Sequence, residues 1–195
     1  AGEWQGADDG STFEVRNPAT GQVLATVPKM GSAETRRAIE AANAAWPAWR
    51  AQPAKARAAI LRKWYQSMLD HADDLARIMT AEQGKPLAEA KGEIQYAASF
   101  LEWFGEEAKR VYGDTIPSPT NDKRIVVVKE PVGVCAAITP WNFPAAMITR
   151  KVGPALAAGC PIVVKPAEAT PLSALALAVL AERAGLPKGV LSIVT

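Results

Sequence analysis

Two short segments of this chain lie at the ends of apolar stretches, and their polar side chains are the ones best suited to chemistry. The first covers residues 138–144 and includes Asn142, and the second covers residues 163–168 and includes Lys165 and Glu168. A carboxylate can accept hydrogen bonds from two ribose hydroxyls, and an ammonium can donate to a ribose or meet a phosphate. Together the two segments indicate a nucleotide-binding crevice.

Each of these residues also has a plainer explanation. The neutral amide of Asn142 could donate to a developing oxyanion without titrating, or it could simply cap a helix that starts near Pro144. Lys165 and Glu168 could be ordinary solvated residues beside a proline turn. The first segment has no GxGxxG sequence, so a dinucleotide would have to bind in a different way from the common fingerprint.

Few other residues could act as nucleophiles or metal ligands. Cys135 and Cys160 lie in apolar stretches without CxxC spacing, which predicts two buried, unreactive thiols and neither a zinc site nor a disulfide. The single histidine, His71, stands beside acidic residues near a helix start, where a solvated surface role is expected. A Cys–His hydrolase is therefore disfavoured, and we expect no metal site.

The elements that must position the two polar segments alternate between strand and helix. The expected order is strand 134–138, helix 144–158, strand 162–165, helix 171–184 and strand 190–194. This alternation predicts an α/β fold, with half of a doubly wound parallel sheet that binds ligands at the carboxyl ends of its strands. Pro144 and Pro171 suit first helical turns, Thr170 could cap the second helix, and Gly185 could end it.

The preceding part of the chain predicts a hairpin, several helices and a ribbon. Residues 12–28 contain two β-rich runs around an Asn-Pro-Ala-Thr-Gly turn. Helical spacing of apolar residues then predicts four helices, of which the first is capped by Ser32 and the last carries one apolar core stripe over residues 87–111. Residues 112–133 predict a protruding β-ribbon with a polar tip, and its unpaired edge favours subunit pairing.

These elements divide the chain into three parts. Residues 1–111 form the hairpin and helical part of a cofactor-binding domain, residues 112–133 form a ribbon for oligomerisation, and residues 134–195 form the first βαβαβ half of the cofactor-binding domain.

Composition excludes several classes of protein. The 195 residues are 49% hydrophobic and 22% charged, and a net charge of +2 is too small to favour nucleic acid or an acidic membrane as a partner. No apolar run reaches the roughly 18 to 20 residues that cross a bilayer. Residues 1–10 are unlike a secretory or mitochondrial leader. We expect a cytosolic protein, or a mitochondrial matrix protein whose leader has been removed.

Four motifs stand in a fixed order along the chain: residues 17–21 (Asn-Pro-Ala-Thr-Gly), 82–86 (Glu-Gln-Gly-Lys-Pro), 139–144 (Thr-Pro-Trp-Asn-Phe-Pro) and 165–171 (Lys-Pro-Ala-Glu-Ala-Thr-Pro). In order and spacing they resemble the amino-terminal part of the aldehyde dehydrogenase superfamily, and the resemblance covers the whole chain. Residues 86–94 and 145–159 look most like its succinate-semialdehyde dehydrogenase branch. The resemblance implies oxidation of a semialdehyde with NAD(P)+, through a catalytic Cys, hydride transfer and a Glu base that hydrolyses a thioester.

The same resemblance implies roles for individual residues. Asn142 matches the oxyanion-hole amide. The residues that would line the nicotinamide half of the cofactor site are Ile138, Thr139, Pro140, Trp141 and Asn142. Those that would line the adenosine ribose are Lys165, Pro166, Ala167 and Glu168.

Two further expectations concern cofactor and substrate. The carboxylate of Glu168 would repel a ribose 2′-phosphate, so we expect a preference for NAD, with NADP also possible. Arg150 matches an arginine that holds the substrate carboxylate, and helical spacing of eight residues places it near the face of Asn142. Its plainer explanation is a solvated residue on the helix surface.

The resemblance also implies what this chain lacks. The family's nucleophilic Cys and Glu base would lie beyond Thr195, so we expect the isolated chain to be inactive and its parent enzyme to be a homodimer or homotetramer. A hypothesis from another class is a non-catalytic nucleotide-binding or assembly module that uses the same sheet half and ribbon.

Overall fold

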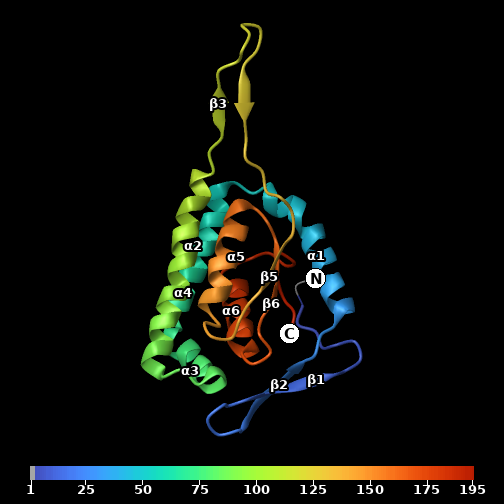
Figure 1. The fold of residues 1–195 in the computed structure, drawn as a ribbon, viewed down its shortest axis with the longest axis vertical. Helices are drawn as coiled ribbons and strands as arrows, with labels where there is room; N and C mark the ends of the chain where they lie inside the picture. The colour runs from blue at the N-terminus through green and yellow to red at the C-terminus, as the bar shows by residue number, and fades with distance from the viewer. Residues whose placement is uncertain (1–2) are drawn as a thin grey trace.

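The fold is built around a parallel sheet with helices on both faces (Figure 1). The structure, a computed structural model, describes residues 3–195, so the first two residues of the segment compared with a leader lie outside it. The strands are β1 (Thr12–Arg16), β2 (Val23–Pro28), β3 (Asp114–Ile116), β4 (Ile125–Val127), β5 (Cys135–Ile138), β6 (Ile162–Lys165) and β7 (Leu191–Ile193). The helices are α1 (Ser32–Arg50), α2 (Ala54–Asp70), α3 (Ala72–Gln83), α4 (Leu87–Glu107), the short 3-10 helix η1 (Ala108–Arg110), α5 (Ala146–Ala158) and α6 (Pro171–Arg183).

The central sheet confirms the predicted half of a doubly wound fold. Its strand order is β5-β6-β7, both neighbouring pairs are parallel, and α5 and α6 form the two crossovers. Helix α6 is followed by Gly185, whose φ of +92° places it in the left-handed region as expected.

The sheet is covered by helices of different origin on its two faces. On one face, Val163 packs with Ala42 of α1 and with Val194. On the other, the neighbouring residue Val164 joins the main core under α5 and α6, because successive side chains of a strand point to opposite faces. Helices α2, α3 and α4 form a further layer outside α5 and α6 (Figure 1).

The helical region differs from prediction at its ends. Helix α4 stops at Glu107 rather than near residue 111, and Leu87 and Val111 are 38% and 48% exposed, so the buried stripe is shorter than the sequence pattern suggested. The chain turns through η1 and then reaches Gly113, which starts the ribbon. Within residues 3–195, no helix combines the length and apolar character needed to cross a membrane.

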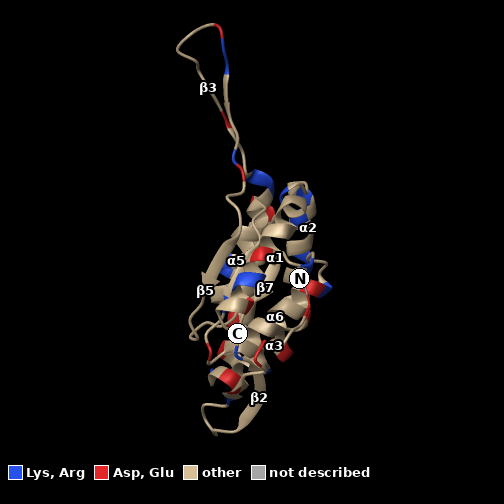
Figure 2. Cartoon of the chain, turned by 90° about the vertical axis from the view of Figure 1, so that its right-hand side faces the viewer, with Lys and Arg blue, Asp and Glu red and all other residues tan. Residues whose placement is uncertain are grey.

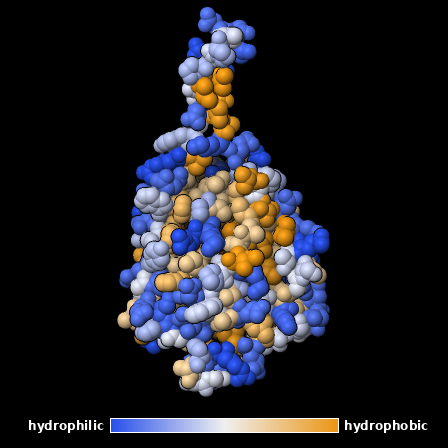
Figure 3. Space-filling view, viewed as in Figure 1, coloured by the Kyte–Doolittle hydropathy of each residue, from blue (hydrophilic) through white to orange (hydrophobic). Residues whose placement is uncertain are grey.

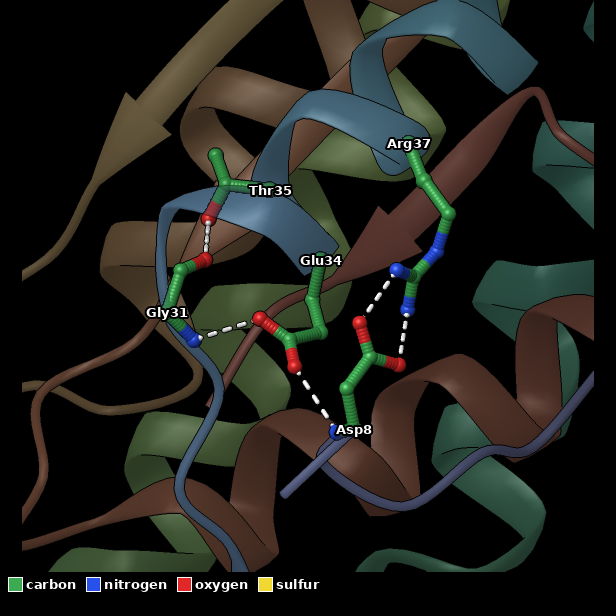
Figure 4. Close-up of polar contacts among 5 residues, drawn as sticks. All are labelled: Asp8, Gly31, Glu34, Thr35 and Arg37. Atoms are coloured by element: carbon green, nitrogen blue, oxygen red, sulfur yellow. Dashed lines mark hydrogen bonds and ion pairs between the residues drawn. The ribbon is translucent and has the colours of Figure 1, made fainter.

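The start of α1 is capped by a residue other than the one predicted. Ser32 is the first helical residue and its side chain makes no cap hydrogen bond. Instead the carboxylate of Glu34 accepts the N–H of Gly31 at 2.9 Å and the N–H of Asp8 at 2.9 Å. Arg37 holds the carboxylate of Asp8 through both terminal nitrogens (Figure 4). The amino-terminal segment is therefore tied to the first turn of α1.

The predicted β-ribbon is confirmed. Strands β3 and β4 pair antiparallel and stand well away from the body (Figures 1 and 2). The ribbon is apolar near its base, where Val126 and Val128 are 68% and 69% exposed (Figure 3). Gly113 admits no side chain, since a Cβ there would lie 2.0 Å from the carbonyl oxygen of Val127.

Candidate active site at the carboxyl edge of the sheet

The two polar segments predicted from the sequence lie side by side at one edge of the sheet. Ile138, the last residue of β5, is in register with Lys165, the last residue of β6. The N–H of Thr139 donates to the carbonyl oxygen of Lys165 at 3.1 Å, which extends the pairing by one residue. The two segments therefore meet at the carboxyl ends of neighbouring strands, as expected, which is where ligands bind in such sheets.

The turn after β5 exposes an apolar wall. Ile138, Trp141 and Phe143 are 81%, 57% and 40% exposed, whereas Thr139 is buried. An exposed apolar surface of this kind favours contact with an aromatic ligand over contact with water.

Asn142 stands in this turn with its amide free. The residue is exposed, and its side chain makes no hydrogen bond to any residue in the range 3–195. Helix α5 begins at Ala146, two residues later than predicted, and its N-cap Ala145 has no side-chain cap. The alternative in which Asn142 caps this helix is therefore wrong, because the cap comes from elsewhere.

That cap is the carboxylate of Glu93, a residue of α4. Its Oε1 accepts the N–H of Ala145 at 3.0 Å and the N–H of Ala146 at 3.3 Å. Glu93 is also paired with Lys85, whose ammonium donates to the carbonyl oxygen of Asn142 at 3.0 Å. Three hydrogen bonds, two to Glu93 and one from Lys85, thus hold the backbone of the turn that carries the free amide.

The turn after β6 presents two charges to solvent. The side chains of Lys165 and Glu168 are 40% and 80% exposed, and their charged atoms lie 3.9 Å apart. Lys165 also donates to the carbonyl oxygen of Pro166 at 2.9 Å, while Pro166 itself is buried and Ala167 is half-buried. An exposed carboxylate beside an exposed ammonium, next to an apolar wall, fits a ribose with an attached ring.

Helix α6 is also capped by a distant carboxylate. Thr170 occupies the N-cap position, as predicted, but its side chain makes no cap hydrogen bond. Glu82 of α3 accepts the N–H groups of Leu172 and Ser173, each at 2.7 Å. Burial raises the pKa of Glu82 to about 6, although the hydrogen bonds from Ser173 and Leu172 oppose the rise.

The two caps limit where a phosphate can bind. In the common dinucleotide fold the pyrophosphate occupies the helix N-terminus after the first strand. Here the N–H groups at the starts of α5 and α6 already serve Glu93 and Glu82. These helix ends are not free for a phosphate, which agrees with the absence of a GxGxxG sequence.

Arg150 projects from the exposed side of α5. Its guanidinium carbon lies 5.5 Å from the ring centroid of Phe100, and Nη1 lies 3.9 Å from Sδ of Met147. It forms no ion pair with the chain between residues 3 and 195. Its charge is therefore available for an anionic group of a ligand.

The cysteines and the histidine lie away from the crevice. Cys135 begins β5 and Cys160 precedes β6, so both are at the amino ends of the strands, opposite Ile138 and Lys165. Cys160 is buried as predicted, but Cys135 is only half-buried. Burial, with the neighbouring Cys160, raises the pKa of the Cys135 thiol.

His71 lies between α2 and α3, where its Nδ1 is 2.8 Å from the carbonyl oxygen of Ser67. In the part of the chain that the structure describes, no cluster of three or more His, Cys, Asp or Glu residues is placed to bind a metal ion.

Three residues that hold these turns and helix starts, namely Lys85, Glu93 and Glu82, were not predicted from the sequence to do so. A signal was available for two of them. Glu93 interrupts the apolar stripe of α4 next to Ile94, and Glu82 falls on the buried face of α3, three residues after Met79. Burying a carboxylate in the core costs free energy unless it has hydrogen-bond or ion-pair partners. Each of these two positions therefore indicated a polar contact with another part of the chain.

Comparison with known proteins agrees with this geometry. The aldehyde dehydrogenase family matches residues 4–195. The chain is 72% identical to a glutarate-semialdehyde dehydrogenase of Pseudomonas aeruginosa over 194 residues. It is 68% identical to the NADP(+) succinate-semialdehyde dehydrogenase of Escherichia coli over 194 residues. In both cases the match covers 100% of this chain and 40% of the relative.

Solved structures support the same grouping. A crystal structure of succinate-semialdehyde dehydrogenase from Burkholderia pseudomallei is 75% identical and superimposes with a TM-score of 0.98, covering 100% of this chain and 40% of that one. The chain thus spans less than half the length of the relatives that it matches. With the family match over residues 4–195 and two of the matching motifs side by side at one edge of the sheet, this chain belongs to the aldehyde dehydrogenase family.

Proposed function

We propose that this chain is the amino-terminal part of an enzyme that oxidises a semialdehyde to the dicarboxylic acid with NAD(P)+. The observation that carries the proposal is the free amide of Asn142, which stands beside an exposed apolar wall and one strand away from Lys165 and Glu168. Relatives at 72% and 68% identity are named for glutarate semialdehyde and succinate semialdehyde. Both aldehydes are therefore candidate substrates.

In the proposed reaction a cysteine thiolate attacks the aldehyde carbon, and negative charge develops on the carbonyl oxygen. Asn142 donates an amide N–H to that oxygen and stabilises the charge as it forms. The nicotinamide cofactor supplies the hydride acceptor when it is bound. A glutamate base then activates water, which releases the acid from the thioester.

Neither cysteine of this chain suits the nucleophile. Cys135 and Cys160 are at the far end of the sheet from Asn142, and the raised pKa of Cys135 is the opposite of what a reactive thiolate needs. The nucleophile and the base would come from the part that the longer relatives have, and the isolated chain would be inactive.

The proposed cofactor contacts are Ile138, Thr139, Pro140, Trp141 and Asn142 for the nicotinamide half, and Lys165, Pro166, Ala167 and Glu168 for the ribose. The preference for NAD depends on Glu168, whose exposed carboxylate would face a 2′-phosphate. One relative at 68% identity is named for NADP, so this position needs a direct test.

In the full-length protein, Glu168→Ser should raise kcat/KM with NADP relative to NAD by about tenfold, which corresponds to about 1.4 kcal/mol of repulsion removed. Steady-state assays with each cofactor give the ratio. An unchanged ratio would remove the argument from charge.

Arg150 is proposed to bind the remote carboxylate of the substrate, and its exposure and lack of an ion pair within residues 3–195 support this role. Arg150→Ala should raise the Michaelis constant for succinate semialdehyde by about 10- to 100-fold, because a charge-assisted bidentate contact is lost. The control substrate is an uncharged aldehyde of similar length. Equal effects on both substrates would reject the role.

The ribbon is proposed to pair subunits into a homodimer or homotetramer. The exposed residues Ile116, Val126 and Val128 give it an apolar surface, and its β edges are unpaired outside the hairpin. Sedimentation velocity of the full-length protein measures the assembly directly, and a monomer at micromolar concentration would contradict the proposal.

The central test is steady-state oxidation of succinate and glutarate semialdehyde by the full-length protein, with NAD and NADP in parallel. Appearance of reduced cofactor with either aldehyde is expected, and the isolated 195-residue chain should give none. Cofactor binding without turnover in the full-length protein would instead support the alternative of a non-catalytic nucleotide-binding module.

A further inference from the structure

A buried ion pair lies directly behind the turn that carries Asn142. Its members are Lys85, in the segment between α3 and α4, and Glu93, in α4, and their side chains are only 11% and 1% exposed. Neither is among the residues proposed above to contact the cofactor. A buried pair adds little stability by comparison with well-packed apolar residues of similar volume, so stability alone does not explain its presence.

The lysine of this pair reaches the backbone of the turn. Its Nζ donates to the carbonyl oxygen of Asn142 at 3.0 Å and lies 4.1 Å from the ring centroid of Phe143. Because a cation is attracted to an aromatic face, the second contact holds the residue next to Asn142 as well. With these partners and Glu93 around it, the ammonium is held against the turn.

The glutamate of the pair holds the other side of the same turn. Its Oε1 accepts the N–H groups of Ala145 and Ala146 at 3.0 and 3.3 Å, which also sets where α5 begins. Gly84, the residue before Lys85, has a φ of +83° and lets the chain turn sharply out of α3. The pair therefore acts on the backbone both at Asn142 and three residues beyond it.

By contrast, the side chain of Asn142 has no such support. It makes no hydrogen bond to residues 3–195 and is open to solvent. An oxyanion donor is effective only if it is already aimed at the point where charge develops, since reorienting it during the reaction consumes the stabilisation. The orientation of this amide must therefore come from the backbone that carries it.

We propose that Lys85 and Glu93 are positioning residues that act through Asn142, by fixing the turn from which its amide is presented to the reacting aldehyde oxygen. This inference rests on the proposed function, in which Asn142 is the oxyanion donor. It predicts that the pair affects turnover more than it affects binding of the adenosine ribose, because α6, which follows the ribose-binding turn after β6, is capped separately by Glu82.

The test is a double-mutant cycle in the full-length protein. The pair is replaced together as Lys85→Met and Glu93→Gln, so that no buried charge is left alone, and the replacement is made with and without Asn142→Ala. With Asn142 present, kcat for succinate semialdehyde should fall about 10- to 100-fold, with a smaller change in the Michaelis constant for NAD. In the Asn142→Ala background the same replacement should lower kcat less than about threefold.

A matched control uses two residues of the same helix, Glu89→Gln with Lys91→Met, which should leave kcat unchanged; Glu89 is exposed, and the side chain of Lys91 is 43% exposed. An equal loss of kcat in both Asn142 backgrounds would overturn the inference, since the pair would then be acting on the fold in general. No loss in either background would overturn it too.

The outcomes also separate this inference from the proposed function. If Asn142→Ala alone leaves kcat unchanged, the oxyanion role fails and the inference fails with it. If Asn142→Ala lowers kcat while the pair replacement does not, only the positioning role is rejected. Circular dichroism and the NAD Michaelis constant check that each variant is folded.

Discussion

The two turns at the carboxyl edge of the sheet differ in how the helix that follows each of them is capped. After β5 and after β6 the chain leaves a strand and enters a helix, and in each case a carboxylate from outside the sheet accepts the first N–H groups of that helix. Glu93, which serves the first turn, is paired with Lys85. Glu82, which serves the second, has no ion pair among residues 3–195.

This difference has a physical consequence. An unpaired buried carboxylate resists ionisation, and burial raises the pKa of Glu82 to about 6. In the first turn the charge of Glu93 is balanced by Lys85. The ion pair also contacts a second part of the turn, since Lys85 donates to the backbone of Asn142. The turn proposed to carry the catalytic amide is thus held at more points than the turn proposed to hold the ribose.

Removing one partner of the pair should have the largest effect on stability. Lys85→Met leaves the carboxylate of Glu93 buried and uncompensated, which should lower the free energy of unfolding by about 3 to 5 kcal/mol. Urea denaturation of the full-length protein measures the change. Adding Glu93→Gln should restore part of the loss, because the buried charge is then removed.

The matched control is Lys91→Met, which breaks an exposed pair between Lys91 and Asp73 on the same side of the molecule. It should lower the free energy of unfolding by less than about 1 kcal/mol. Similar losses for Lys85→Met and Lys91→Met would mean that the buried pair is not special, and the contrast between the two turns would lose its basis.

The second turn should show its difference as a dependence on pH. The pKa of Glu82 is raised from 4.5 to about 6 in the folded protein, so the folded state binds this proton more tightly than the unfolded state does. Its contribution to stability is therefore greatest below pH 4.5 and is lost as the pH rises through about 6. Relative to Glu82→Gln, the wild-type protein should lose about 2 kcal/mol across this window.

Unfolding free energies at several pH values between about 4.5 and 7 give this difference, with Glu82→Gln as the non-titrating reference. Parallel pH curves for the two proteins would show that Glu82 titrates as it does in the unfolded chain. Glu89→Gln, at an exposed position of α4, provides a control that should run parallel to the wild type.

The smallest effect is expected at Asn142 itself. Because Glu93 caps α5 and the side chain of Asn142 bonds to nothing in residues 3–195, Asn142→Ala should change the free energy of unfolding by less than about 0.5 kcal/mol. Thermal unfolding and kcat, measured on the same variant, separate its effect on stability from its effect on catalysis. A loss near 1 kcal/mol, the usual effect of removing a helix cap, would restore the capping role that the structure assigns to Glu93.

The strands and crossovers of the sheet were predictable from sequence to within about two residues. Strand β6 lies at residues 162–165 as predicted, because a short, continuous apolar run bounded by a glycine and a proline has few alternatives in an α/β pattern. The crevice residues at its end, Lys165 and Glu168, followed from the same pattern. Whether Asn142, Arg150 and Glu168 have their proposed roles stays a prediction.

The caps were not predictable from local sequence. Ser32, Thr170 and Asn142 all have the side chains that favour an N-cap, yet none of them makes a cap hydrogen bond. In α5 and α6 the acceptor comes from residues 52 to 91 positions away in the chain. N-cap preferences consider only residues near the helix start, so they cannot predict a hydrogen bond that depends on tertiary packing.

The distant caps also bear on how this crevice can change over evolution. Since Glu93 and Glu82 cap the helices after both turns, the exposed side chains at positions 142 and 168 are not needed to cap them. A substitution at position 168 can therefore be selected for a different cofactor with little loss of stability, while the side chain at position 142 can be kept for catalysis alone. The carboxylates of α3 and α4 keep the two turns in place, so a surface side chain of these turns can change without loss of the fold.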